Sequence, residues 1–286
     1  MSKILASKEL ITLQKSLFKD ECSKLAEKGI KPTMKVILVG SFAPSVIYTR
    51  NKKKFIEDIG GSCEIINLDE NIKEADFLSE VNKITEDKSV HGCFIQLPLP
   101  KQLSSTDLST LIPPQKDVDG FHPHNLDLLL RGDVGNKSLL PCTPKGIIKL
   151  LNHFKIEING KNVLVIGRSM IVGKPMALLI LNHNGTPTIA HSRTSDVKSL
   201  AKSADIIISA VGKAKFLDQS WLGDKKPWII DVGMNHDKDG KLCGDVDFES
   251  VISKSSGCTP VPGGVGPMTI CSLVENLITA TKRQTL

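Results

Sequence analysis

Aromatic residues and long apolar runs are both scarce in this sequence. Aromatic side chains make up 4% of the 286 residues, with a single tyrosine, Tyr48. The longest apolar run, Met176 to Leu181, is far shorter than the roughly 20 residues of a membrane-spanning helix. The first residues also lack the uninterrupted apolar core of a secretory signal. We therefore expect a cytoplasmic protein with no membrane partner.

Paired cysteines and a strong charge of one sign are missing as well. The seven cysteines are scattered singly without a Cys-x-x-Cys pair, so the sequence predicts neither a disulfide framework nor a bound metal. The net charge is +6, and the only dense basic block runs from Arg50 to Lys54. This is poor support for nucleic-acid binding, and it suits an anionic small-molecule substrate equally well.

Strand-like and helix-like segments alternate along most of the chain. Helical periodicity is expected over 8–28, 46–59 and 72–87, and buried strands over 34–40, 63–68 and 90–96. The alternation restarts after a Pro/Gly-punctuated stretch at 140–146, with strands expected at 162–166, 186–190, 205–211 and 228–232. The pattern predicts two α/β units with parallel sheets, the second a Rossmann-like doubly wound sheet. Ligands are then expected beyond the carboxyl ends of the strands.

The turn after the strand at 162–166 is a candidate dinucleotide site. Gly167 and Gly173 bracket it, and such glycines let a backbone turn tightly so that helix N–H groups face a pyrophosphate. Glycine after a strand is equally ordinary turn chemistry, so this turn alone leaves the question open. Arg168 in this turn, and the run from His191 to Arg193 at the next strand end, replace the carboxylate typical of an NAD site. They favour a 2′-phosphate and hence NADP.

Candidate reactive groups lie in the first unit. Tyr48 and Lys52 are four residues apart in an expected helix and so share one face. A partly desolvated lysine can move a proton, although this stretch taken alone fits a solvated basic face better. Gln96 ends a strand in a Pro-stiffened segment, and Asp117 and Asp119 lie in a turn too short of acidic ligands to be a calcium loop.

Together these segments resemble the bifunctional methylenetetrahydrofolate dehydrogenase/methenyltetrahydrofolate cyclohydrolase family. The matching segments come in the family's order and span nearly the whole chain. They are Tyr48-Thr-Arg-Asn-Lys52, Ile95-Gln-Leu-Pro-Leu-Pro100, Lys116-Asp-Val-Asp-Gly120, Pro141-Cys-Thr-Pro-Lys-Gly146, Gly167 to Met176, Gly244-Asp-Val246 and Pro260 to Thr269.

The resemblance implies domain boundaries and site residues. Residues 1–141, completed by a last helix over 269–286, would form a folate-binding catalytic domain, and 142–268 an NADP-binding domain, with the folate cleft between them. Lys52 would be catalytic, with Gln96 tuning it, Tyr48 stacking along the folate and Asp119 anchoring the pterin. Further substrate-binding residues would be Ile95, Leu97, Pro262, Gly263, Gly264, Val265 and Gly266. The residues meeting NADP would be Gly167, Arg168, Ser169, Ser192 and Met234.

The resemblance also implies the reaction and its setting. A tetrahydrofolate derivative would be oxidised with NADP and then hydrolysed to 10-formyltetrahydrofolate, without a metal. The protein would serve one-carbon metabolism and with it purine, methionine and histidine biosynthesis, as a homodimer. Two features depart from the family: the loop Gly40 to Ser45 lacks the expected acidic residues, and Asp127 stands where glycine is often found.

Two rival functions remain to be separated from this one. A monofunctional NAD-dependent methylenetetrahydrofolate dehydrogenase has the same fold, but Lys52, Gln96, Arg168 and Ser192 argue against it. A non-catalytic dinucleotide-binding module would need only the second unit, and it would leave the polar residues of the first unit without a shared purpose.

Overall fold

The structure, a computed structural model, describes residues 2–286. The chain forms two compact units. Among the described residues, the first contains 2–12, 129–136 and 143–269, and the second contains 13–128, 137–142 and 270–286. Among the described residues, no helix is long and apolar enough to cross a membrane.

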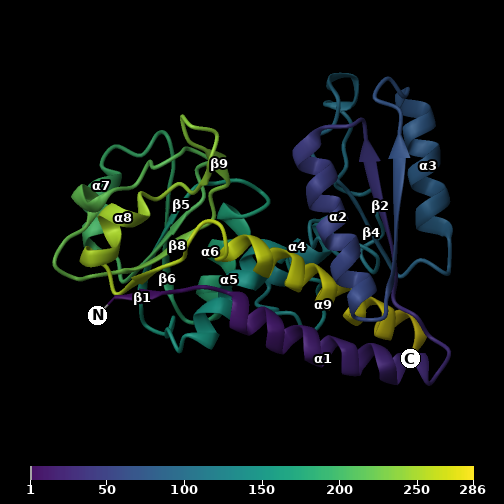
Figure 1. Cartoon of the computed structure of the whole chain (residues 1–286), viewed down its shortest axis with the longest axis horizontal. Coiled ribbons are helices and arrows are strands. Elements are labelled where there is room, and N and C mark those ends of the chain that lie inside the picture. Colours follow the sequence, from purple (N-terminus) through teal and green to yellow (C-terminus); the bar gives the residue numbers. More distant parts are fainter. Residues whose placement is uncertain (1) are drawn as a thin grey trace. The chain divides into compact units, whose positions relative to one another are not determined.

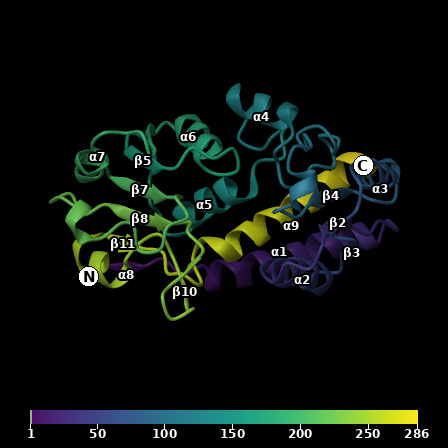
Figure 2. The same cartoon turned by 90° about the horizontal axis from the view of Figure 1, so that it is seen from above.

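The first unit is built on a six-stranded parallel sheet. Its order is β1-β11-β8-β7-β5-β6, and Figure 2 shows β11, β8, β7 and β5 side by side. The strands are β1 (Lys3–Ile4), β5 (Asn162–Ile166), β6 (Thr186–Ala190), β7 (Ile206–Ser209), β8 (Trp228–Asp231) and β11 (Gly257–Cys258). The chain runs from β5 to β6 on one side and then to β7 on the other. The order of the strands therefore reverses at β5, which is where open α/β sheets bind ligands.

Helices and a short hairpin complete this unit. The helices include α5 (Cys142–His153), α6 (Gly173–Asn182), α7 (Val197–Ser203) and α8 (Phe248–Val251), with 3₁₀ turns at Gln219–Trp221 and Ile252–Lys254. The strands β9 (Asn235–His236) and β10 (Leu242–Cys243) pair antiparallel. The β5, β7 and β8 strands are almost wholly buried, as expected of strands covered on both faces.

The second unit holds a three-stranded parallel sheet in the order β3-β2-β4. Its strands are β2 (Thr33–Val39), β3 (Ser62–Leu68) and β4 (Gly92–Ile95). Its helices are α2 (Ala43–Asp58), α3 (Glu74–Glu86) and α4 (Pro123–Leu130), the last two residues of which group with the first unit, with a 3₁₀ turn at Lys101–Leu103. Figure 1 shows α2 and α3 on either side of the sheet. This is the arrangement that right-handed crossovers produce when successive connections run in opposite directions.

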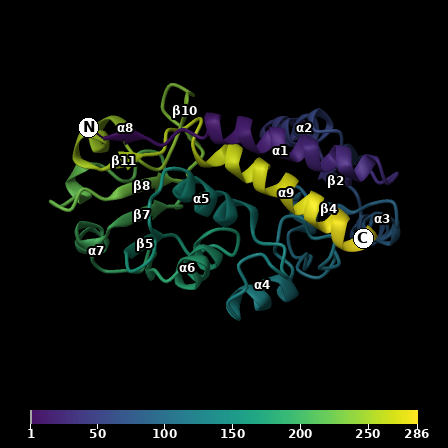
Figure 3. The same ribbon diagram turned by 90° about the horizontal axis from the view of Figure 1, so that it is seen from below.

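Two long helices contribute residues to both units. The α1 helix (Lys8–Ala26) belongs to the first unit up to Thr12 and to the second unit from Leu13. The α9 helix (Val265–Thr285) belongs to the first unit up to Thr269 and to the second unit from Ile270. In the second unit, the C-terminal part of α9 lies beside β4 (Figure 3). A Cβ atom added to Gly92 would lie 3.0 Å from Leu277 Cδ1. Asn276 also donates hydrogen bonds to the carbonyls of Val118 and Leu140, at 2.9 and 2.8 Å.

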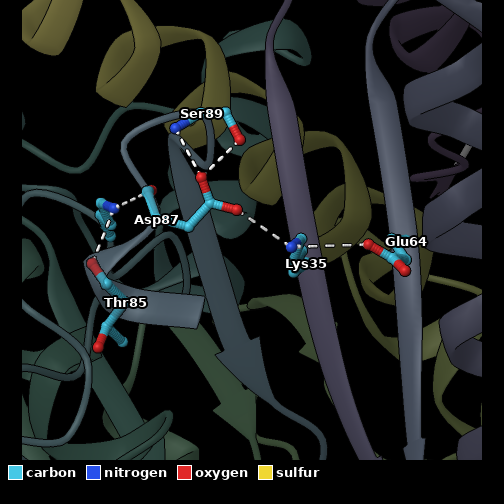
Figure 4. A network of polar contacts seen from close by, with 6 residues as sticks. Lys35, Glu64, Thr85, Asp87 and Ser89 are labelled. Atoms are coloured by element: carbon cyan, nitrogen blue, oxygen red, sulfur yellow. Dashed lines mark hydrogen bonds and ion pairs between the residues drawn. The ribbon is translucent and has the colours of Figure 1, made fainter. Parts of the chain in front are cut away.

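A polar network ties the start of the second unit's sheet to the segment after α3 (Figure 4). Lys35 Nζ on β2 lies 3.2 Å from Asp87 Oδ2 and 3.7 Å from Glu64 Oε2 on β3. Ser89 donates to Asp87 Oδ1 from both its backbone and its hydroxyl. These hydrogen bonds hold the pKa of the Asp87 carboxyl at about 2.

The predicted fold class is confirmed, and the observed units depart from the expected boundaries at two places. Residues 2–12 group with the first unit because β1 pairs in parallel with β11, at Lys3 with Gly257 and Ile4 with Cys258. Residues 129–136 group with it too, and there Asn182 donates to the Leu129 carbonyl at 2.8 Å. All seven cysteines are free thiols, and no cluster of metal-binding side chains occurs among residues 2–286.

Candidate functional site

The α2 helix positions the reactive groups of the second unit. Its buried residues Ser45, Thr49 and Lys52 follow a spacing of three and four, which places them on one face of the helix. The Ser45 hydroxyl donates to the Leu97 carbonyl at 3.2 Å. The helix is thereby tied to the segment that leaves β4.

Lys52 lies on the buried face of α2 and is only 5% exposed. Its Nζ donates to Gln96 Oε1 at 3.3 Å, and Gln96 Nε2 donates in turn to the Leu97 carbonyl at 2.7 Å. The second hydrogen bond orients the amide so that its oxygen faces the lysine. The Lys52 ammonium also lies 3.8 Å from the centre of the Phe94 ring and 5.5 Å from that of Tyr48.

Burial lowers the pKa of Lys52, and the nearby Asp119 carboxylate opposes that shift. A lysine with a lowered pKa gives up its proton more readily than a solvated lysine. Burial also raises the pKa of Tyr48, with a smaller contribution from Asp119, so the phenol stays protonated at neutral pH. The site therefore holds one group able to exchange a proton and one neutral aromatic surface beside it.

The two acids of the Asp-x-Asp turn have different surroundings. Asp117 is buried and accepts hydrogen bonds from the backbone of Gly120 and His122 and from the Asn125 amide, at 2.7 to 3.0 Å. Burial raises its pKa to about 6. These contacts make Asp117 a structural residue of the turn. Asp119 is partly exposed, and burial raises its pKa against the opposing effects of Lys52 and of a hydrogen bond from Cys142.

The other expected substrate-binding residues lie in two segments. Ile95 is buried at the end of β4 and Leu97 is half-exposed, 49%, just beyond it. Residues 262–266 belong to the first unit, whereas Lys52 and Gln96 belong to the second. In this glycine-rich segment Gly263 has a φ of 104°, and its carbonyl accepts two hydrogen bonds from Ser7. The assignment of residues 262–266 to the substrate stays a prediction.

The first unit has a tight glycine turn at the carboxyl end of β5. Gly167 adopts a φ of 133°, and a Cβ atom there would lie 2.4 Å from the Ala210 carbonyl oxygen. A Cβ atom on Gly173 would lie 2.2 Å from the Gly167 carbonyl oxygen. Only glycine fits at either position. The Ser169 hydroxyl accepts from the backbone N–H groups of Val172 and Gly173 at the start of α6, at 3.2 and 3.4 Å.

A cavity of about 470 Å³ opens beside this turn. Its lining comes from the carboxyl ends of β5, β6 and β7 and includes Gly167, Arg168, His191, Ser192, Val211 and Lys213. Of the residues expected to meet the cofactor, Gly167, Arg168 and Ser192 line it. Ser169 and Met234 are not among the lining residues, and Met234 is 54% exposed.

Lys213 is a cation of this cavity that sequence reasoning missed. It follows the last residue of β7, Ser209, by four residues, and this place just after a strand end is the sequence signal that could have found it. The described lining includes Arg168, His191 and Lys213 and no carboxylate. Cationic side chains and close-packed glycines are what a phosphorylated dinucleotide requires.

Comparison with known proteins matches two long stretches of the chain to one family. The catalytic domain model of tetrahydrofolate dehydrogenase/cyclohydrolase matches residues 5–119, and the NAD(P)-binding domain model of the same family matches residues 141–285. The chain belongs to the tetrahydrofolate dehydrogenase/cyclohydrolase family.

Members of this family match the chain over nearly its full length. The bifunctional protein FolD of Agathobacter rectalis is 46% identical over 283 residues, covering 99% of this chain and 100% of that protein. The crystal structure of the bifunctional FolD enzyme from Campylobacter jejuni is 40% identical, with a TM-score of 0.94 and 99% coverage of both chains. The Trypanosoma brucei FolD, solved with NADP cofactor and an inhibitor, is 30% identical with a TM-score of 0.92, covering 99% of this chain and 98% of that chain.

Proposed function

We propose that this chain catalyses two consecutive reactions on a tetrahydrofolate derivative. It oxidises 5,10-methylenetetrahydrofolate to 5,10-methenyltetrahydrofolate with NADP⁺, and it hydrolyses the product to 10-formyltetrahydrofolate. The main structural observation that supports this proposal is the buried Lys52, which is hydrogen-bonded to Gln96 and has a pKa lowered by burial. The full-length likeness to bifunctional FolD proteins supports both activities.

The residues near Lys52 bind and orient the folate. The Tyr48 ring supplies a flat surface for the pterin and aminobenzoate parts, and Ile95 and Leu97 supply apolar contacts. Asp119 accepts hydrogen bonds from the amide and amino edge of the pterin, while Asp117 is occupied in holding its turn. Residues 262–266 present backbone to the same substrate. Orientation alone can contribute several kcal/mol to such a reaction.

Hydrolysis requires proton transfer at defined atoms. Water adds to the methenyl carbon and loses a proton to Lys52 Nζ. The bond from that carbon to N5 then breaks as N5 takes up a proton and the new hydroxyl loses one, which leaves the formyl group on N10. The Gln96 oxygen, 3.3 Å from Nζ, keeps the amine in place through both steps. A lowered lysine pKa suits a group that must both accept and return a proton.

The first unit binds NADP, which supplies the hydride acceptor for the oxidation step. Arg168 and Ser192 receive the 2′-phosphate, and the close-packed turn from Gly167 to Gly173 receives the pyrophosphate. Ser169 supports this turn by accepting hydrogen bonds from the N–H groups of Val172 and Gly173. Met234 is assigned to the nicotinamide end. In domain terms, residues 1–141 with 269–286 serve the folate and 142–268 serve NADP.

The likeness to FolD proteins also supports a finer assignment. We infer that the chain works as a cytoplasmic homodimer and supplies one-carbon units for purine, methionine and histidine biosynthesis. This rests on the family resemblance alone.

Purified protein tests the two activities separately. It is mixed with 5,10-methylenetetrahydrofolate and either NADP⁺ or NAD⁺, and reduced nicotinamide and methenyltetrahydrofolate are followed by absorbance. We expect reduction of NADP⁺ without methenyl accumulation, and hydrolysis of added methenyltetrahydrofolate in the absence of any nucleotide. Methenyl accumulation with NAD⁺ would indicate the monofunctional dehydrogenase instead. No turnover with either nucleotide would indicate a binding module.

A further inference from the structure

One buried carboxylate of the first unit has no role in the chemistry above. Asp245 lies in the segment from Gly244 to Val246, directly after β10, and is fully buried. A buried carboxylate is costly unless its oxygens are hydrogen-bonded. The partners that satisfy Asp245 therefore indicate what it does.

The Asp245 side chain holds the backbone of three successive residues. Its Oδ2 accepts from the N–H groups of Val211 at 2.7 Å and Gly212 at 3.2 Å, and its Oδ1 accepts from the N–H of Lys213 at 2.9 Å. Oδ1 also accepts from the Asn235 side-chain amide at 2.9 Å. One carboxylate thus joins the loop after β7 to the residue that follows Met234.

The loop held by Asp245 forms a wall of the dinucleotide cavity. Val211 and Lys213 both line that cavity. The neighbouring Ala210 carbonyl is the atom against which Gly167 packs, at 2.4 Å from the position of an added Cβ atom. A shift of this loop would therefore move both the Lys213 cation and the glycine turn.

A second carboxylate fixes Asp245 itself. Asp231, at the end of β8, accepts from the N–H groups of Asp245 at 2.9 Å and Val246 at 3.0 Å. The packing leaves no room for side chains at two intervening glycines. A Cβ atom on Gly244 would lie 1.8 Å from Asp231 Oδ2, and one on Gly233 would lie 2.3 Å from Asp245 Oδ1.

The charge of Asp245 excludes a direct role in binding phosphate. A carboxylate would repel the phosphate groups of the dinucleotide. Both oxygens of Asp245 also already accept hydrogen bonds from N–H groups of the protein. Asp245 acts on the dinucleotide through the loop that it holds. We infer that Asp245 is a positioning residue for NADP, which fixes the backbone of residues 211–213 as one wall of its site. This inference rests on the proposed use of NADP.

The variant Asp245→Asn tests this role. The change replaces one carboxylate oxygen by an NH₂ group, which must face N–H donors and cannot accept from them. We expect the dissociation constant for NADPH, measured by calorimetry, and the KM for NADP⁺ to rise about tenfold or more. Nucleotide-free hydrolysis of methenyltetrahydrofolate should stay within twofold of the unsubstituted enzyme, because that activity is assigned to Lys52 in the other unit.

Two further variants keep the test decisive. Asp247→Asn is the matched control, since Asp247 lies two residues away and its side chain makes no cap hydrogen bond to the helix that it precedes. It should change neither constant. If Asp245→Asn does not fold, Asn235→Ala removes a single contact to Oδ1 and should raise the NADPH dissociation constant by a smaller factor.

The outcomes separate this inference from the proposed function. If the unsubstituted enzyme neither binds NADPH nor reduces NADP⁺, the proposed function fails. If it does both, and Asp245→Asn binds NADPH equally well, the positioning role is wrong. A variant that melts at lower temperature but keeps its NADPH affinity would assign Asp245 to stability alone and would also overturn the inference.

Discussion

Lys52 and Gln96 form a hydrogen-bonded pair in which the lysine Nζ lies 3.3 Å from the amide Oε1. The amide is itself held by its hydrogen bond to the Leu97 carbonyl. The lysine comes from the middle of α2 and the glutamine directly follows β4, so the pair depends on the packing of a helix against a sheet. The properties of the pair can be tested one partner at a time.

Lys52→Met should separate the two activities. The substitution keeps an unbranched apolar chain in the buried position but removes the proton-exchanging amine. We expect hydrolysis of methenyltetrahydrofolate to fall at least about a hundredfold, the usual contribution of a general acid or base, while part of the NADP⁺ reduction remains. The control is Lys53→Met, whose side chain is 41% exposed and pairs with Glu57. Equal loss of both activities in a folded Lys52→Met protein would contradict the assignment.

Gln96→Glu should move the pH dependence of hydrolysis. A carboxylate in place of the amide would stabilise the charged ammonium and raise the pKa of Lys52. The acid limb of the hydrolysis profile should therefore shift to higher pH, with lower activity at neutral pH that recovers as the pH rises. Rates measured from pH 6 to 10 check this. An unchanged profile would show that Lys52 is not the titrating group.

Arg168→Ala should weaken NADP more than NAD. Arg168 lines the dinucleotide cavity, and loss of a charge-assisted hydrogen bond to phosphate costs about 1.5–3 kcal/mol. We expect the KM for NADP⁺ to rise roughly tenfold to a hundredfold while the KM for NAD⁺ changes little. The control is Arg193→Ala, since Arg193 follows Ser192 but does not line the cavity. Equal effects of Arg168→Ala on both nucleotides would place the 2′-phosphate elsewhere.

Asp87→Asn should reduce stability in a pH-dependent manner. The pKa of Asp87 is lowered to about 2 by hydrogen bonds from Ser89 and Lys35. Its stabilising effect is therefore present above about pH 4, the ordinary range for this side chain, and is lost as the pH falls toward 2.

We expect Asp87→Asn to lower the free energy of unfolding by about 1 kcal/mol at pH 7, because the carboxylate is 33% exposed and solvent screens its ion pair. The difference should shrink as denaturation is repeated at lower pH. Glu64→Gln is the control, since Glu64 lies farther from Lys35 and is 61% exposed. A difference that does not depend on pH would mean that packing, not ionisation, explains the loss.

Local sequence patterns predict most of the elements that carry the site. The expected strand at 63–68 is observed as Ser62–Leu68 and the expected helix at 46–59 as Ala43–Asp58, because periodicity and Gly/Pro punctuation act within the element itself. The pairing of β1 with β11 joins residues some 250 positions apart through two-residue strands. No local pattern marks such short strands, so the sequence does not predict that the N-terminal residues group with the first unit.

For the polar residues too, local sequence patterns predict some features, whereas others depend on contacts between distant parts of the chain. The four-residue spacing of Tyr48 and Lys52 predicts a shared helix face, and the Lys52 ammonium does lie near the Tyr48 ring, 5.5 Å from its centre. The nearer ring, that of Phe94 at 3.8 Å, comes from β4 and is not part of that helical pattern. The different surroundings of Asp117 and Asp119 cannot be read from a turn in which both are acidic, because the three hydrogen bonds to Asp117 are made only in the folded chain. Asp245 was part of a matching segment without a role. Its carboxylate accepts from backbone N–H groups that lie more than 30 residues earlier in the chain and from the nearer Asn235 amide.

The path of the chain between the two units constrains how this enzyme can evolve. It changes unit after Thr12, Leu128, Asn136, Cys142 and Thr269, and two of these positions lie inside α1 and α9. Neither unit therefore corresponds to one continuous stretch of the gene, so neither can be exchanged or deleted as a cassette by a single recombination. The two activities are inherited together. A lineage that dispenses with one of them is expected to lose it through point substitutions at positions such as Lys52 or Arg168, while keeping both sheets intact.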